Sequence, residues 1–181
     1  YAVRPARLII SDAAWRGAAA SSLPTRRIDL AGEFEEPFTF YWAGERKDLL
    51  AALARERWGS PAGWNPLSLV GIFPEGALKA QPVAPVLHDG EFPALTLVAP
   101  DYAPEARHIL RMWRTSAHLD GRKECSIWVA SIVRQPSRRL WAGYRRMDDE
   151  EDDFAATSPP ARRQSPGCEV GNWGIVPAAP Q

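Results

Sequence analysis

Residues 82–133 read PVAPVLHDGEFPALTLVAPDYAPEARHILRMWRTSAHLDGRKECSIWVASIV, and this stretch decides the fold. Its apolar and β-branched runs are separated by turn residues, a pattern that predicts four consecutive strands. Asp89 and Gly90 lie between the first two runs. A type I′ turn needs positive φ at both central residues, and an Asp-Gly pair tolerates it, so this pair predicts a hairpin. We therefore expect a β-meander over about residues 83–133.

The residues before the meander predict one more strand and one well-formed helix. Residues 38–42 read FTFYW, and aromatic side chains suit a pleated, half-buried surface. Within residues 45–58, leucines recur at helical spacing and charged residues fill the opposite side, with Gly44 in place to serve as N-cap. Shorter elements are expected at residues 7–10 (a strand), around Trp15 (a helical turn) and at residues 67–73 (a helix).

This order of elements defines the expected fold class. Strands that follow one another, with the helix apart from them, favour an α+β fold over a parallel α/β fold. We predict a mostly antiparallel sheet of five or six strands with the helices packed on one face. The length of 181 residues suits one such domain, which we place at residues 1–147. Residues 148–181 are acidic and then Pro-rich, and we expect a partly mobile tail that docks back near Trp173.

Charge and composition limit the possible partners. The formal net charge is zero and the pI is near 7, whereas nucleic-acid binding favours a basic excess. No run of residues approaches the roughly 20 apolar residues of a membrane span. Since the chain begins at Tyr1 and not at Met, we expect it to be a piece of a longer protein, which leaves a membrane-bound parent open. Cys125 and Cys168 are expected to be thiols and not a bridge.

The residues that could react or bind a metal do not form a recognisable motif. His88, His108 and His118, assisted by Asp89 or Cys125, could hold zinc, but their spacing matches no ligand signature. We interpret the three histidines as a turn, a strand and a loop residue. Cys125 lies near cations that could lower the pKa of its thiol, but a structural thiol is the simpler interpretation. We expect no metal and no cofactor.

Anion binding is the functional hint that the residues favour most. Strand alternation places Arg107, Arg111 and Trp113 on one face of the third strand, and the apolar set that includes Leu110 and Met112 on the other. Arg offers a planar fork for phosphate, and Trp suits a lipid–water boundary. The alternative is a solvated face on which the Arg stems cover Trp113. His88 and Asp89, at the predicted turn, complete the candidate binding residues.

Several stretches together resemble the LssY C-terminal domain family. They read RRIDLAGEFEEPFTFYWAG (26–44), LHDGEFPALTLV (87–98), HILRMWRT (108–115) and SIWVASIVRQ (126–135). The resemblance implies a domain at the carboxyl end of a bacterial integral-membrane protein, after a membrane region of the phosphatidic-acid-phosphatase type and often a DedA-like region. It implies no activity for the domain itself, and the phosphatase motif Pro-Ser-Gly-His does not occur in this chain.

These observations lead to one expected function and one rival. We expect a soluble, non-catalytic accessory or ligand-binding domain that is tethered to the membrane through its parent chain, on the extracytoplasmic side. Its partners would be the membrane-spanning region of that chain and a lipid headgroup, another anionic small molecule or a protein. The alternative is an enzyme, a phosphoester hydrolase or a metal-dependent one, with its site around the His88–Asp89 hairpin.

Overall fold

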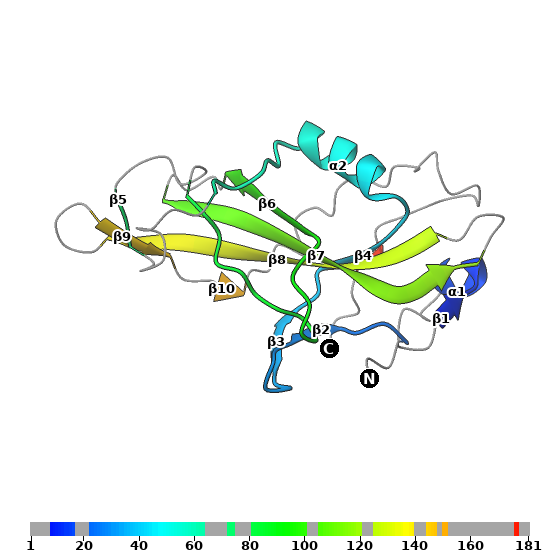
Figure 1. The fold of residues 1–181 in the computed structure, drawn as a ribbon. Coiled ribbons are helices and arrows are strands. Elements are labelled where there is room, and N and C mark those ends of the chain that lie inside the picture. Colours follow the sequence, from blue (N-terminus) through cyan, green and yellow to red (C-terminus); the bar gives the residue numbers. More distant parts are fainter. Residues whose placement is uncertain are drawn as a thin grey trace.

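A single large sheet dominates the computed structural model (Figure 1). The structure describes residues 8–16, 22–63, 72–74, 81–100, 105–120, 125–139, 144–147, 150–151 and 176–177. Its elements, in chain order, are β1 (Leu8–Ile10), α1 (Asp12–Arg16), β2 (Arg26–Ile28), β3 (Phe34–Pro37), β4 (Phe40–Ala43), α2 (Arg46–Arg55), β5 (Ile72–Pro74), β6 (Leu95–Pro100), β7 (Ala106–Leu119), β8 (Cys125–Arg139), β9 (Tyr144–Met147), β10 (Glu150–Glu151) and β11 (Val176–Pro177).

Strands β7 and β8 form the centre of the sheet, and shorter strands pair with them. β6 and β1 pair with different parts of β7, while β4, β10 and β9 pair with successive parts of β8. The pairings are antiparallel except that of β1 with β7. β11 extends the sheet beyond β4, and β5 beyond β9, to give nine strands among the described residues. β2 and β3 form a separate two-stranded ribbon.

Both faces of the sheet are buried, because different segments cover them. On one face Leu110 and Met112 of β7 pack with Leu49 and Leu53 of α2. The other face carries Trp113, together with further apolar clusters that include Trp15 of α1. Figure 1 shows α2 on one side of the sheet and the β2–β3 ribbon on the opposite side. The molecule therefore has three layers over this region.

A bulge bends β7 without exchanging its two faces. Between Arg114 and His118 the ladder shifts, so that four residues of β7 span two residues of β8. The insertion is even, and side chains in a strand alternate with a period of two, so Ala117 stays on the same face as Trp113. Thr115 stabilises the bend, since its Oγ1 donates to the carbonyl of Ile127 and accepts from the N–H of Ala117.

The predicted sheet is confirmed, but several of its details differ. The number of strands exceeds the five or six expected, and the described helices pack on opposite faces and not on one. Within the meander, β6, β7 and β8 form, but β7 continues to Leu119, so that His118 lies in a strand and not in a loop, and β8 continues to Arg139, past the predicted end at residue 133. Residues 82–87 make no strand. Two prolines, Pro82 and Pro85, interrupt that segment and help to leave it without a ladder, because proline has no N–H to donate. Helix α2 begins after Glu45, which replaces Gly44 as N-cap.

The predicted short helix at residues 67–73 and the predicted tail are only partly described by the structure. Ile72 and Phe73, the last residues of an expected short helix, belong to strand β5, and the rest of that helix lies outside the described residues. Within the expected tail, β10 pairs with β8, and β11 pairs with β4. Trp173 lies outside the described residues. The longest described helix, α2, has 10 residues, so no described helix is long and apolar enough to cross a membrane.

Candidate binding site beneath residues 81–92

The candidate site lies where residues 81–92, here called the cover segment, cross one face of the central strands. Alternation along β7 places Arg107, Ile109, Arg111 and Trp113 on this face. The β8 residues opposite them in register share the face, and they are Gln135, Val133, Ser131 and Val129 respectively. Val83 of the cover segment packs on Ile109 in the middle of the face. The polar residues are therefore enclosed and do not face solvent.

Arg107 fixes the start of the cover segment. Its guanidinium donates to the carbonyl oxygens of Gln81 and Pro82, at 2.6 Å and 2.9 Å. Its Nε donates to Oε1 of Gln135 at 2.8 Å. Only 1% of Arg107 is exposed, so these charge-assisted bonds form in a desolvated setting, where they are strong and costly to lose.

Arg111 belongs to a second buried polar cluster, with Glu36 of β3 and Arg27 of β2. One carboxylate oxygen of Glu36 accepts from Nε of Arg27 at 2.7 Å, and the other lies 3.8 Å from a guanidinium nitrogen of Arg111. Arg27 also donates to the carbonyl of Leu87 at 2.7 Å. The cluster therefore joins the sheet, the ribbon and the cover segment. A carboxylate between two guanidiniums balances part of the charge that burial would otherwise penalise.

An aromatic cluster closes the other end of the face. The ring of His88 meets Phe38 and Trp113 edge-on, with centroids 5.0 Å and 5.8 Å away. The Nε1–H of Trp113 donates to the carbonyl of Glu91 at 3.1 Å. Nδ1 of His88 accepts from the N–H of Ile28 at 3.2 Å, which places the proton of the neutral ring on Nε2. Burial lowers the pKa of His88, so the imidazole is neutral near pH 7.

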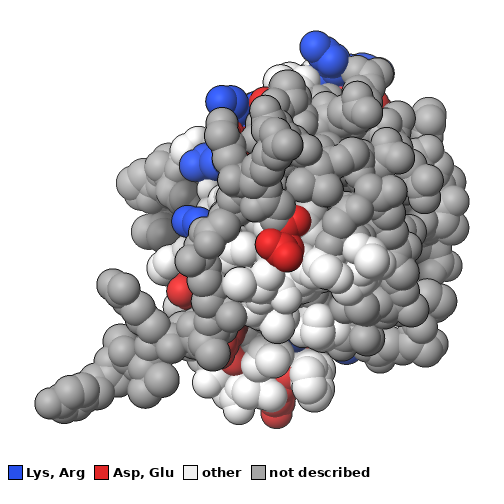
Figure 2. Space-filling model, turned by 90° about the vertical axis from the view of Figure 1, so that its right-hand side faces the viewer, with Lys and Arg blue, Asp and Glu red and all other residues white. Residues whose placement is uncertain are grey.

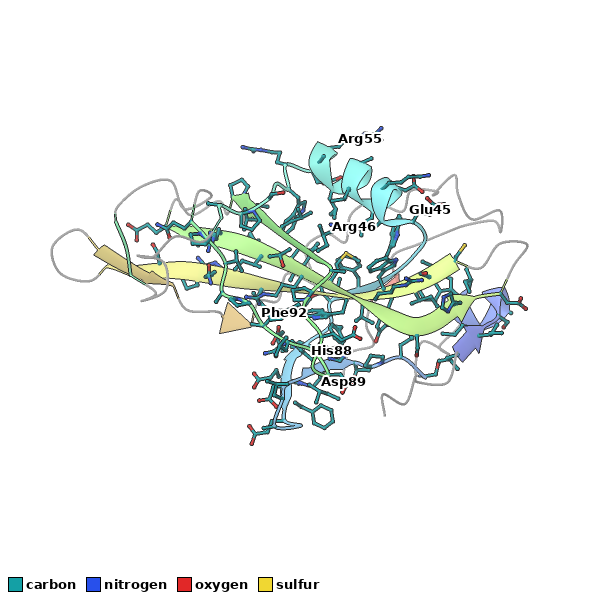
Figure 3. All side chains as sticks on the ribbon, in the orientation of Figure 1. Glu45, Arg46, Arg55, His88, Asp89 and Phe92 are labelled. Atoms are coloured by element: carbon teal, nitrogen blue, oxygen red, sulfur yellow. The ribbon has the colours of Figure 1, made fainter. Side chains whose placement is uncertain are left out.

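The Asp89–Gly90 turn forms as predicted. Asp89 has φ of 49° and Gly90 has φ of 79°, and His88 pairs with Glu91 across them through two backbone hydrogen bonds. The turn docks on the ribbon, because the N–H of Asp89 donates to the carbonyl of Ile28 at 3.0 Å. Figure 3 shows His88 and Asp89 beside β2, on the side of the sheet away from α2. The side chain of Asp89 is exposed.

Three buried polar side chains at this site keep unused hydrogen-bonding capacity. Within the described part of the chain, Oγ of Ser131, the side-chain amide of Gln81 and one carboxylate oxygen of Glu36 make no hydrogen bond. Ser131 lies opposite Arg111 in register and is fully buried. Buried polar groups of this kind usually bind an ordered water.

The structure separates residues that the sequence could have grouped into a metal site. His108 lies on the face of β7 opposite to that covered by His88, and His118 lies near the end of the strand. Among the described residues, no group of three His, Cys, Asp or Glu side chains could hold a metal ion. Cys125 is disulfide-bonded, so the expectation of a free thiol is wrong for this residue. Cys168 lies outside the described residues.

The alternative of a solvated Arg face is also wrong. Arg107, Arg111 and Trp113 are each only 1% exposed, because the cover segment and the ribbon lie over them. Arg114 alternates to the other face, is exposed, and donates to Oγ of Ser126. Farther along β8, Arg138 and Arg139 are in register with Arg146 and Arg145 of β9, and the side chains of these four residues are outside the description.

Comparison with known families gives one match. The model of the LssY C-terminus family covers residues 20–145 of this chain. The chain belongs to that family. No curated protein and no solved structure matches it.

The matched residues of this LssY C-terminal domain contain the whole described site. The sequence identified Arg107, Arg111, Trp113, His88 and Asp89 as candidates, and the structure brings the first four against one face of the sheet. It did not identify their partners. These lie far away along the chain and carry no local pattern, and they are Arg27, Glu36, Gln81, Ser131 and Gln135.

Proposed function

We propose that this LssY C-terminal domain is a non-catalytic binding domain of a bacterial membrane protein, held near the membrane by its parent chain. One observation carries the proposal. The side chains best suited to chemistry hold the fold together: Arg107 and Trp113 hold the cover segment, and the ring of His88 is packed between Phe38 and Trp113. A general base or nucleophile must instead reach a substrate.

The same observation argues against the rival hydrolase. Nδ1 of His88 accepts a backbone N–H, so this nitrogen is not available to accept a proton or to ligate a metal. His108 of β7 lies on the other face of the sheet. Neither Asp89, at an exposed turn, nor the disulfide-bonded Cys125 supplies a partner for the imidazole.

Of the two ligand classes expected, a protein partner has more support than an anionic headgroup. A headgroup would need the guanidiniums of Arg107 and Arg111, and these are buried and held by oxygens of the chain itself or close to Glu36. An anion at Arg111 would compete with the carboxylate of Glu36. A protein partner that binds to exposed surface does not have to displace the carboxylate of Glu36.

The proposal places the domain on the extracytoplasmic side. The disulfide at Cys125 supports this placement, because disulfides persist in oxidising compartments and are rare in the cytosol. The placement can be tested by isolating the chain from intact cells and treating it with a thiol-reactive maleimide, with and without reductant. A thiol that is labelled without reductant would argue for a reducing compartment.

A turnover assay tests the absence of catalysis. We expect the isolated 181-residue chain to release no phosphate from phosphatidic acid or lysophosphatidic acid. The variant His88→Asn is the control for any activity that is found. Hydrolysis by the wild-type chain that His88→Asn abolishes would establish the rival enzyme and refute the proposal. Inorganic phosphate should raise the melting temperature no more than chloride of equal ionic strength does.

A further inference from the structure

Two large apolar side chains of the β2–β3 hairpin are exposed. Leu30 is 74% exposed and Phe34 is 72% exposed. Single exposed hydrophobic residues are common, but neighbouring ones indicate an interaction site. We call Leu30 and Phe34 the apolar tip.

Backbone contacts place the Asp89–Gly90 turn of the cover segment against this hairpin. Phe34 is in register with Ile28 across the ribbon. Ile28 in turn accepts from the N–H of Asp89 and donates to Nδ1 of His88, so the turn of the cover segment rests on the ribbon. Figure 3 shows His88 and Asp89 next to this ribbon, with Phe92 farther from it, toward the sheet.

The hairpin holds a fixed shape. Oδ1 of Asp29 accepts from the N–H groups of Ala31 and Glu33, at 2.8 Å and 2.9 Å. Gly32 takes a φ of +84°, which suits glycine in a tight turn. A preorganised surface loses little conformational entropy on binding, so the exposed Leu30 and Phe34 are suited to recognition.

Carboxylates surround the apolar tip. The exposed charged residues within 26–36 and 87–94 are Glu33, Asp89 and Glu91, all of them acidic. Figure 2 shows acidic and uncharged surface toward the lower end of the described part of this face, while the visible Lys and Arg gather toward its upper left.

This charge decides between the two kinds of partner that an apolar tip could meet. An anionic membrane surface would repel the carboxylates around the tip. A protein surface with apolar side chains between Lys and Arg would be attracted to them and would also cover Leu30 and Phe34. Resting on the proposed function, we infer that the apolar tip docks onto a basic, apolar segment of a protein partner.

The test measures binding of two peptides to the 181-residue chain by fluorescence anisotropy. One is an amphipathic peptide of Lys and Leu, and the other replaces every Lys with Glu. The double variant Leu30→Ser/Phe34→Ser removes the tip, and Ile9→Ser is the matched control, since Ile9 is 60% exposed on strand β1. Because all three side chains are exposed, the variants should keep the unfolding midpoint of the wild type.

We expect the Lys/Leu peptide to bind, and the double variant to weaken that binding at least about tenfold, as the loss of two buried apolar side chains implies. Glu33→Lys should weaken binding and reduce its dependence on salt, while Ile9→Ser should leave it unchanged. Equal binding of both peptides, or a double variant that binds like the wild type, would overturn the inference.

Vesicles provide the second arm. The chain should bind vesicles of phosphatidylglycerol no better than vesicles of phosphatidylcholine. Binding to phosphatidylglycerol that Leu30→Ser/Phe34→Ser abolishes would make the tip a membrane contact and overturn the inference. Substitutions at the tip should not alter the phosphate-release assay, so this inference and the proposed function fail on different measurements.

Discussion

Replacing Arg107 with methionine tests whether buried guanidiniums hold the cover segment on the sheet. The substitution keeps most of the aliphatic stem, so apolar packing changes little. It removes the donors to the carbonyls of Gln81 and Pro82 and to Oε1 of Gln135. These three oxygens then lose their donor in a buried region, since Arg107 itself is only 1% exposed.

The expected magnitude follows from those acceptors. A buried group that loses its partner costs about 1–3 kcal/mol. Three such groups, partly rehydrated by water entering beside the cover segment, should lower the free energy of unfolding by about 3–6 kcal/mol. Arg114→Met is the matched control, because it makes the same change in the same strand at an exposed residue. Its cost should stay within about 0.5 kcal/mol.

Urea unfolding followed by Trp fluorescence gives both free energies. Hydrogen exchange then locates the effect, because amides of residues 81–92 should exchange faster in Arg107→Met while those of α2 change less. If Arg107→Met is too unstable to measure, Arg107→Lys can replace it. This variant keeps the charge, so its free energy of unfolding should lie between those of the wild type and of Arg107→Met. Equal losses for Arg107→Met and Arg114→Met would refute the reasoning.

Three further predictions concern neighbouring residues. The pKa of His88 is lowered by burial, so the unfolded chain binds a proton at higher pH than the folded chain does, and stability should fall as the pH drops below about 6.5. His88→Asn, which can still accept from Ile28, should flatten that part of the curve of unfolding free energy against pH, and an unchanged slope would contradict the cause. Ser131→Ala removes a buried hydroxyl that makes no hydrogen bond among the described residues, so thermal unfolding should show equal or higher stability, and a loss above about 1 kcal/mol would reveal a hidden partner. Gly90→Ala should cost about 1–2 kcal/mol in urea unfolding, because its φ is +79° and no atom obstructs a Cβ, while Gly63→Ala should cost little, and equal costs would rule out the backbone explanation.

The sequence predicted the elements whose signals are local. Alternation defined β7 and β8, the Asp89–Gly90 pair defined its turn, and leucines at helical spacing defined α2. Residues 82–87 were wrongly predicted to form a strand. Their apolar character suits a strand, but a strand also needs hydrogen bonds to the backbone of a neighbouring strand. The same limit applies to Cys125, whose disulfide is indicated by no local pattern.

The amino-acid order alone therefore determined that β7 has two different faces, and which residues lie on each. It could not determine what covers those faces, because an arginine stem is stable both in solvent and beneath a segment that supplies acceptors. The tertiary structure decided this for Arg107 and Arg111. Gln81 and Pro82 lie more than twenty residues before Arg107, and Glu36 lies farther still from Arg111, so that only folding brings their oxygens to the guanidiniums.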